Sequence, residues 1–600
     1  MKKDGRLIMA KSRSEIDDRF KWAVNDIFES DKAWNDDYVV LLEQCRKESP
    51  YQGKIGDSAI NLAGVLEEEN EEEFRCERLY VYAFMKYYED TANPVYQEMS
   101  GKAQMLAVNL SEKYSFVEPE INAVDGEVMK SFMEDDRVKP YNHLLSDMLS
   151  QKEHSLSPKE EKLLAMASQM AEGPKEIFSR FNNADIDFGM IKDESGNEVP
   201  LTHGTFGVYM ESQNREVRKE AFYALYKQYM SHINTLAAAF NANVTQAVFF
   251  ARARKYPSTL NMYLSASFIP ESVYTNLCDT VNRNLDKMHR YVSLRKQALG
   301  VDELHFYDIY APMVPDFKME VTYEEAKEIA IKALAPLGEE YTATVREAYE
   351  SGWVDVYENS GKRSGAFSWG VYGTHPYLFL NYNNTLNDVF TLVHEMGHSM
   401  HTYYSNNAQP FMYSGYRIFV AEVASTCNEA LLINYLLEHC TDEAERKYLI
   451  NHYLEQFKGT LFRQTMFAEF EMECHRMAEQ GEVLNADNLC RLYKELNVKY
   501  FGKDMVIDDE IAYEWARIPH FYTPFYVYQY ATGFSAAISI ATRILSGDKE
   551  TLDGYKKFLA GGGSMHPIEL LKLCGVDMSQ PQVIQDALDV FGKLLEEFAG

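Results

Sequence analysis

The chain has 600 residues, of which 46% are hydrophobic and 25% are charged, and this balance is that of an ordinary globular protein rather than a disordered one. The formal net charge is −31, which argues against nucleic acid or an anionic membrane as a main partner. No stretch approaches 18 uninterrupted apolar residues and no signal peptide is recognisable, so we expect no membrane partner. The eight cysteines are scattered without a CxxC pair, which is typical of reduced thiols, so we expect a cytoplasmic protein.

Most of the chain carries helix signals. Residues 157–160 (SPKE) and 322–325 (TYEE) each place a capping residue three positions before a glutamate, ahead of apolar residues at helical spacing. Residues 215–252 contain neither proline nor glycine, and residues 442–479 contain a single glycine, so each stretch predicts a long helix. The polar loop at 192–197 (KDESGN) suggests a domain boundary near residue 200.

The stretch from Trp353 to Tyr382 has a different pattern. Residues 353–357 alternate, glycines interrupt the chain, and residues 376–380 form a short apolar run, so we expect a small β-sheet in an otherwise helical protein. The strand at 377–380 could bind a peptide by adding its backbone to the sheet, with nearby glycines allowing close approach; a purely structural hairpin is the alternative. The first hypothesis makes these residues substrate-binding: Gly373, Tyr377 and Phe379.

A metal-binding motif follows this sheet, because residues 391–402 read TLVHEMGHSMHT. His394 and His398 are four positions apart, so on a helix both imidazoles lie on one face and can bind one ion. Thr385 and Asp388 provide a helix cap, which supports the helical context. Glu395 is placed to reach a water on that ion, and zinc makes such a water acidic enough to attack a peptide bond at neutral pH.

A catalytic zinc ion takes three protein ligands and leaves the fourth position to water. The third histidine of the extended HExxHxxGxxH pattern would fall at Tyr404, so that pattern fails, and His401 is interpreted as a packing or outer-sphere residue. Residues 419–429 predict a second helix in which Glu422 and Glu429 lie on about the same face among apolar residues. A buried carboxylate is costly unless it is paired or bound to a metal, so either acid is a candidate ligand.

The motif HEMGHSMH, followed by FVAEVASTCNEALL, resembles peptidase family M3, the thimet oligopeptidase and oligoendopeptidase F group. The resemblance runs over most of the chain and is densest from 353 to 535, including YENSGKRSGAF at 357–367. One residue departs from the family pattern: Ser360, in a loop, stands where a lysine is expected. It implies one Zn²⁺ per chain with Glu422 as the third ligand. It also implies that Glu429 orients a ligand histidine.

The same resemblance implies a mainly α-helical fold with a deep substrate channel and the small sheet near the active site. We expect an N-terminal helical domain over 1–200 and a catalytic domain over 201–600 that hydrolyses short unfolded peptides, with Glu395 as the base. The segment 518–530 contains one histidine and four tyrosines, a composition that is equally typical of a core. The resemblance favours a role for it in stabilising the oxyanion, and the residues selected are His520 and Tyr528, then Tyr522.

Three hypotheses about function remain distinct. The first is an endopeptidase of short peptides, the second an exo-acting zinc peptidase, and the third a peptide-binding scaffold without activity. A peptide with both ends blocked is cut under the first hypothesis and spared under the second. The third predicts loss of a ligand or of the base, and yet His394, Glu395, His398 and Glu422 are all present.

Overall fold

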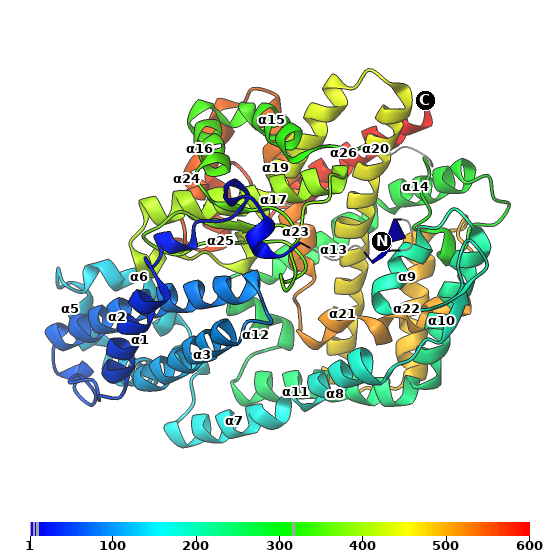
Figure 1. The fold of residues 1–600 in the computed structure, drawn as a ribbon. Coiled ribbons are helices and arrows are strands. Elements are labelled where there is room, and N and C mark those ends of the chain that lie inside the picture. The colour runs from blue at the N-terminus through cyan, green and yellow to red at the C-terminus, as the bar shows by residue number, and fades with distance from the viewer. Residues whose placement is uncertain (1, 4–5, 8–10, 315–318) are drawn as a thin grey trace. The chain divides into compact units, whose positions relative to one another are not determined.

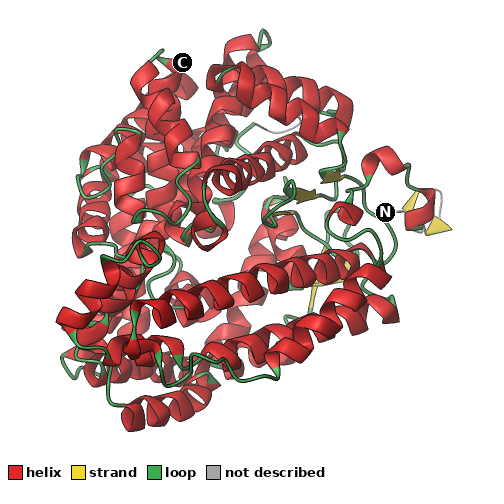
Figure 2. Ribbon diagram, turned by 90° about the vertical axis from the view of Figure 1, so that its left-hand side faces the viewer, coloured by secondary structure: helices red, strands yellow, loops and turns green. Residues whose placement is uncertain are grey.

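The computed structural model describes residues 2–3, 6–7, 11–314 and 319–600, and helices make up most of the described chain (Figures 1 and 2). This confirms the predicted mainly α-helical class. The strands are short, as Figure 2 shows. None of the described helices is long and apolar enough to span a bilayer.

The contacts between residues divide the chain into two compact units, each built from three segments. Unit 1 comprises residues 1–153, 319–432 and 541–575, and unit 2 comprises 154–318, 433–540 and 576–600. The helices α19 (Ile418–His439) and α23 (Tyr528–Leu545) have residues in both units. The domain boundary near residue 200 stays a prediction.

Unit 1 contains the N-terminal helices and the predicted sheet. Its core includes Trp34, whose indole N–H donates to the Leu79 carbonyl at 2.8 Å, and Tyr82, whose hydroxyl donates to Asp31 at 2.8 Å. The remaining helices of this unit are α1 (Asp31–Cys45), α2 (Ala59–Glu89), α3 (Pro94–Tyr114), α4 (Val117–Ala123), α5 (Gly126–Met133), α6 (Asn142–Ser150), α15 (Tyr323–Ala333), α16 (Glu339–Glu350), α17 (Leu386–Ala408), α18 (Phe411–Ser414), α24 (Lys549–Leu559) and α25 (Pro567–Leu573).

The predicted sheet forms, with β5 (Val354–Asp355) parallel and β6 (Phe367–Trp369) antiparallel to the central strand β7 (Tyr377–Phe379). The sequence-based hypothesis that β7 adds a peptide as an extra strand is wrong for this sheet, because both sides of β7 are already paired. The side chains of Tyr377 and Phe379 are fully buried. The edge strands are β5 and β6. The chain beside β5 already hydrogen-bonds to the N-terminal segment, with the Ala23 N–H donating to the Gly352 carbonyl at 2.7 Å and the Val356 N–H to the Phe20 carbonyl at 3.0 Å.

A buried ion cluster ties the N-terminal segment to this sheet. Asp355 lies 2.6 Å from the Arg13 guanidinium and 2.7 Å from the Lys362 ammonium. Burial raises the pKa of the Asp355 carboxyl, but the two cations outweigh burial and hold the pKa below its usual value. The paired charges therefore fix the start of the chain against β5.

Unit 2 is also helical, with one hairpin of β3 (Met190–Lys192) and β4 (Glu198–Pro200) at the predicted polar loop. The capping boxes predicted at Ser157 in this unit and at Thr322 in unit 1 are present. The helices of unit 2 are α7 (Pro158–Ala171), α8 (Gly173–Arg180), α9 (His203–Met210), α10 (Arg215–Ser231), α11 (Ile233–Ala253), α12 (Thr259–Ser265), α13 (Glu271–Arg283), α14 (Leu285–Ala298), α20 (Glu443–Gln456), α21 (Arg463–Glu479), α22 (Ala486–Phe501) and α26 (Gln582–Ala599).

The two long helices predicted in this unit have different outcomes. The prediction of one helix over 215–252 is wrong, because the chain leaves helical geometry at His232 between α10 and α11. The His232 ring nitrogen lies 2.9 Å from the Gln228 carbonyl, which a continuous helix would reserve for the backbone N–H of His232. The stretch 442–479 is helical as predicted, but a π-helix at Phe457–Phe462 joins α20 to α21.

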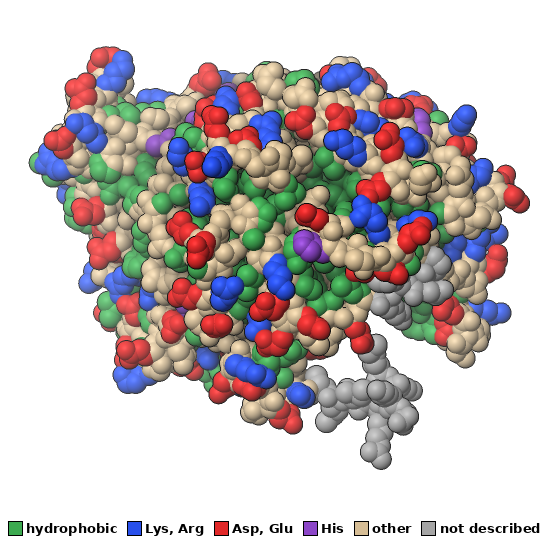
Figure 3. Space-filling view, turned by 90° about the horizontal axis from the view of Figure 1, so that it is seen from above, with side chains coloured by type: hydrophobic (Ala, Val, Ile, Leu, Met, Phe, Trp, Pro, Cys, Tyr) green, Lys and Arg blue, Asp and Glu red, His purple; other side chains and the backbone are tan. Residues whose placement is uncertain are grey.

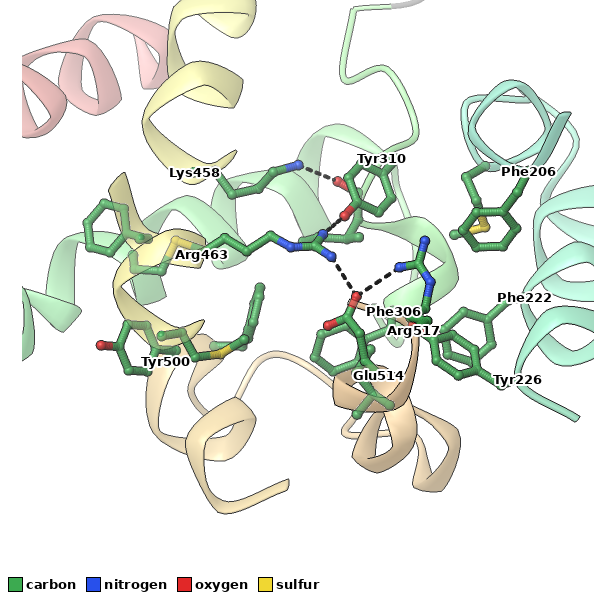
Figure 4. Close-up of a pocket in the computed structure, with 17 residues that line it drawn as sticks. Phe206, Phe222, Tyr226, Phe306, Tyr310, Lys458, Arg463, Tyr500, Glu514 and Arg517 are labelled. Atoms are coloured by element: carbon green, nitrogen blue, oxygen red, sulfur yellow. Dashed lines mark hydrogen bonds and ion pairs between the residues drawn. The ribbon is translucent and has the colours of Figure 1, made fainter. Parts of the chain in front are cut away.

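Unit 2 contains a partly open pocket of about 40 Å³, with room for roughly one or two water molecules. Aromatic and methionine side chains supply most of its lining, as Figure 4 shows. The Glu514 carboxylate accepts hydrogen bonds from Arg463 at 2.6 Å and from Arg517 at 3.3 Å, so the two guanidinium groups are neutralised in part by one acid (Figure 4). Tyr493 donates a third hydrogen bond to it, at 2.6 Å.

On the face of the molecule shown in Figure 3, acidic and basic side chains are intermixed rather than separated into broad patches of one sign. Many neighbours of opposite charge form local pairs on helices, such as Lys32 with Asp36 at 2.5 Å. Exposed pairs of this kind contribute little to stability, so we interpret these charges as a solvated surface.

Candidate metal centre

Helix α17 carries the HExxH motif and forms as its sequence predicts. Thr385 and Asp388 make a reciprocal capping box, in which the Thr385 hydroxyl accepts from the Asp388 backbone N–H at 3.2 Å and donates to the Asp388 carboxylate at 2.7 Å. The apolar residues Leu392, Val393 and Met396 are fully buried. Burial of this face fixes the rotation of α17 and so directs the histidine face toward α19.

Close contact between α17 and α19 depends on Gly397, which lies between the two histidines in sequence. A Cβ atom at position 397 would lie 2.5 Å from the Ser425 Cα atom and 2.8 Å from the Ala424 carbonyl oxygen. The side-chain amide of Asn428 also donates to the Val393 carbonyl at 3.3 Å. The two helices therefore meet backbone to backbone, and this brings Glu422 within reach of the histidines.

Three donor atoms converge where the helices meet. The Nε2 atoms of His394 and His398 are 3.2 Å apart, and each lies 3.4 Å from the Glu422 Oε2 atom. A tetrahedral ion with bonds of 2.0–2.1 Å separates its ligand atoms by roughly 3.3 Å, so this nearly equilateral triangle fits zinc. Two imidazoles and one carboxylate are also a ligand set that suits zinc better than calcium or magnesium.

Glu429 binds the opposite side of one ligand ring. Its Oε1 atom forms a short hydrogen bond with His394 Nδ1, the nitrogen that does not face the other two donors. A carboxylate in this position fixes the ring orientation and keeps the proton on Nδ1, which leaves Nε2 available for a metal. The predicted role of Glu429, which is to orient a ligand histidine, stays a prediction that this contact supports.

The electrostatic environment gives different roles to Glu395 and Glu422, the two acids beside the ligand histidines. Burial raises the pKa of Glu395, an effect reduced by the charges of His394 and His398. Burial also raises the pKa of Glu422, but hydrogen bonds from the same two histidines outweigh it and hold that pKa below the usual range. Glu422 is thus favoured as a permanent anion, and Glu395 as a group that exchanges a proton nearer to neutral pH.

His401 is on the same helix but does not join the donor triangle. It is fully buried, and its ring stacks on Tyr416 with centroids 3.7 Å apart. Burial lowers the pKa of His401 to about 3, so the ring is neutral at physiological pH. The structure thus supports the interpretation of His401 as a packing residue.

Comparison with known families assigns the chain. The model of peptidase family M3 matches residues 208–590, and the model described as Oligopeptidase F matches residues 120–188. The chain belongs to peptidase family M3. It is therefore a metallopeptidase, and the donor triangle lies inside the part matched by the first model.

Similar proteins agree over nearly the whole chain. Oligopeptidase PepF of Bacillus subtilis is 48% identical over 98% of this chain and 88% of its own length. The Oligoendopeptidase F homolog of Lactococcus lactis is 42% identical, with 98% of each chain covered. The solved oligoendopeptidase-F of Enterococcus faecium is 37% identical, with a TM-score of 0.75 over 95% of this chain and 98% of its own.

The predicted oxyanion-stabilising residues of this M3 chain belong to unit 2, where they separate into two groups. Tyr522 and Tyr528 are buried, with the Tyr522 ring stacked on Phe178 at 4.4 Å and the Tyr528 ring 4.9 Å from Tyr274. His520 is exposed. The neighbours of the His520 ring are different tyrosines, with centroid distances of 6.2 Å to Tyr526 and 6.0 Å to Tyr530.

Sequence reasoning missed one acid that supports this segment. Glu471 is fully buried on α21, its Oε1 atom accepts the Phe525 backbone N–H at 2.8 Å, and its Oε2 atom has no hydrogen-bond partner within the described part of the chain. Phe525 has φ +55°, a left-handed conformation that is strained for a bulky residue. Glu471 therefore stabilises a strained turn between His520 and Tyr526. The available signal was the helical spacing, because positions three and four residues from Glu471 are Phe467, Ala468, Cys474 and His475.

We expect Glu429→Gln to weaken zinc binding by about 10- to 100-fold, because the amide cannot supply the negative charge that holds the His394 ring. Competition with a chelator of known affinity measures the change. Glu438→Gln is the matched control, because Glu438 lies on the same helix with an exposed side chain. Equal affinities for the Glu429 variant and the control would contradict this role.

We also expect Glu471 to make stability depend on pH. Burial raises its pKa to about 8, whereas a glutamate in the unfolded chain titrates near 4.3, so the folded state binds the extra proton between these values. The contribution of Glu471 to the free energy of unfolding is therefore complete at low pH, and it is lost as the pH rises toward 8. Melting temperatures of the wild type should fall from pH 5 to pH 8 more steeply than those of Glu471→Gln. An exposed control, Glu482→Gln, should follow the wild type.

Proposed function

We propose that this M3 metallopeptidase is a zinc-dependent endopeptidase of short, unfolded peptides, with one zinc ion per chain. The observation that carries the proposal is the triangle of His394, His398 and Glu422 donor atoms with sides of 3.2–3.4 Å, beside the buried Glu395. The substrate class is supported by the names of the relatives, which are oligopeptidases and oligoendopeptidases.

Zinc held by this triangle supplies Lewis acidity toward the scissile carbonyl and toward water. Glu395 accepts the proton of the attacking water and transfers it to the leaving amine, a role that its raised pKa favours. Glu429 keeps His394 in the tautomer that leaves Nε2 free to bind the ion.

Donors to the developing oxyanion are proposed from the segment around His520. The three rings of His520, Tyr526 and Tyr530 form one cluster, since the two tyrosine centroids are 5.5 Å apart. Hydroxyl and imidazole N–H groups are suitable donors to an oxyanion. Tyr528 and Tyr522 stay candidates, although their rings pack against Tyr274 and Phe178.

We propose β6 as the strand that pairs with the substrate backbone. It is an edge strand, and the Ser368 hydroxyl lies 2.7 Å from that of Ser399, the residue after the ligand His398. Phe379 of β7 supports β6 from within, because its ring stacks on Phe367 at 4.8 Å. Gly373 stays a candidate for close backbone approach, and a deep channel that admits only unfolded peptides stays part of the proposal.

We place the protein in the cytoplasm, a compartment that keeps thiols reduced. All eight cysteines are described, and each is a free thiol. Five of them are buried, so in the folded protein they are protected from oxidation.

A fluorogenic peptide acetylated at its N-terminus and amidated at its C-terminus tests the proposal. An endopeptidase cuts it internally, and chelation abolishes cleavage until Zn²⁺ is restored. Cleavage only of peptides with a free end would establish an exopeptidase, and binding without cleavage would establish a scaffold. A folded protein that contains the same cleavable sequence should be spared.

A further inference from the structure

A second set of metal-ligating side chains lies in unit 1, apart from the residues of the proposed active site. His143 and Asp147 come from α6, and His566 comes from the residue before α25. One donor atom from each of these residues lies within 4.8 Å of the other two. Among the described residues, only this set and the triangle of His394, His398 and Glu422 meet that condition.

Two of the three donor separations need only small adjustments to hold an ion, and the third, between His143 and His566, is at most 4.8 Å. The Asp147 Oδ1 atom lies 2.8 Å from His566 Nε2 and 3.9 Å from His143 Nδ1. His143 and Asp147 are four positions apart on one helix, the spacing by which α17 presents its two histidines. Ligand atoms around zinc are separated by roughly 3.3 Å, so one contact must lengthen and the other must shorten by about half an ångström each.

The surroundings hold these side chains in place before any ion binds. The Arg417 guanidinium lies 2.9 Å from Oδ2 of Asp147, which leaves Oδ1 directed at the histidines. Tyr413 holds the start of α6 through two hydrogen bonds: its hydroxyl donates to the Pro140 carbonyl at 2.9 Å and accepts from the Leu144 N–H at 3.3 Å.

The loop that carries His566 is attached to the same support. The Gly563 backbone N–H donates to the Tyr413 carbonyl at 2.8 Å. A Cβ atom at position 562 would lie 2.2 Å from that carbonyl oxygen, and the φ of Gly562 is +52°, so only glycine fits this close approach. The loop and α6 thus have fixed places relative to each other within unit 1.

We propose that His143, Asp147 and His566 form a second, peripheral site for a divalent transition metal such as Zn²⁺. Two imidazoles and one carboxylate favour zinc and its neighbours over magnesium and calcium, and the three side chains are half-buried, so a hydrated ion reaches them from solvent. A bound ion cross-links α6 to the loop before α25. It is held less tightly than the ion at the His394 triangle, because Arg417 already neutralises Asp147.

The test uses the full-length enzyme with its catalytic zinc in place, titrated with Zn²⁺ alone. Isothermal titration and metal analysis should find a second equivalent in the wild type. His566→Ala should lose that equivalent, or bind it at least about tenfold more weakly, while it retains the first equivalent and peptidase activity. The added metal should raise the melting temperature of the wild type and leave that of His566→Ala unchanged.

Two further variants keep the result interpretable. Asp147→Asn removes the charge but preserves the shape of the side chain, and it should also abolish the second equivalent. His439→Ala removes an exposed histidine outside both sets and should bind two equivalents. A wild type that binds only one equivalent, or a His566→Ala enzyme that binds two with unchanged affinity, would overturn the proposal and leave the cluster as an ion pair network. Neither result depends on which peptides the enzyme cuts.

Discussion

Gly397→Ala is expected to lose most of its zinc affinity and to lower kcat/KM by about 100-fold or more. The added methyl group would lie 2.5 Å from the Ser425 Cα atom and 2.8 Å from backbone atoms of residues 424 and 425. Backbone atoms in a helix cannot rotate aside, so α17 and α19 must separate. A displacement of about 1 Å is sufficient to cost roughly 100-fold in rate, because Glu422 then no longer completes the donor triangle.

Zinc content after dialysis, zinc affinity by chelator competition and peptidase activity together measure this effect. Gly101→Ala is a suitable control, because Gly101 lies within helix α3 of the same unit and a Cβ there meets no atom within 4 Å. The control should match the wild type or be slightly more stable, since alanine favours helix more than glycine does. Retention of normal zinc affinity by Gly397→Ala would show that the helices need not approach so closely.

Glu395→Gln is expected to retain zinc and lose hydrolysis by about 100- to 10,000-fold, the contribution of a general base. Glutamine preserves the size of this buried side chain, so the fold and the ligand triangle should persist. The amide cannot accept the proton of water, and therefore the loss should fall on kcat rather than on peptide binding. Steady-state kinetics and metal analysis of the purified variant test both halves of this expectation.

His398→Ala provides the contrasting variant. The substitution removes the His398 Nε2 atom, which lies 3.2 Å from the His394 Nε2 atom and 3.4 Å from the Glu422 Oε2 atom. Zinc binding and activity should therefore both be lost. The pair of variants separates metal binding from proton transfer. Full activity in Glu395→Gln would exclude it as the base, and full activity in His398→Ala would place the catalytic ion elsewhere.

The parts of the site that could be predicted from sequence are those set by local spacing. The positions of His394 and His398 on one helix face follow from the helical period, and the cap at Thr385 follows from side-chain chemistry. Glu422 and Glu429 required the additional resemblance to family M3. Spacing alone places both acids on about the same face of α19, and which acid meets which histidine nitrogen depends on how two helices pack.

Features that depend on long-range pairing could not be predicted in this way. The apolar run 376–380 contains the strand β7, but its sequence does not determine whether that strand is central or at an edge. The order is decided by pairing with residues 354–355 and 367–369. Similarly, the selection of Tyr528 and Tyr522 with His520 rested on the resemblance, because composition alone is equally typical of a core. The two tyrosine rings near His520, those of Tyr526 and Tyr530, follow the turn at Phe525, and Glu471, 54 positions earlier, supports that turn.

The π-helix at Phe457–Phe462 has a consequence for the length of the chain that the protein tolerates. A π-turn accommodates an additional residue within a helix, and one residue corresponds to 100° of rotation. Deleting Gly459 would therefore convert the wide turn into ordinary α-helix and leave α21 facing its neighbours as before, whereas a deletion within α21 itself, ahead of Glu471, would turn one side of the helix against the other by that angle. Glu471 would still reach Phe525 after the loss of Gly459, so the chain tolerates one residue fewer in the π-helix but not a few positions later.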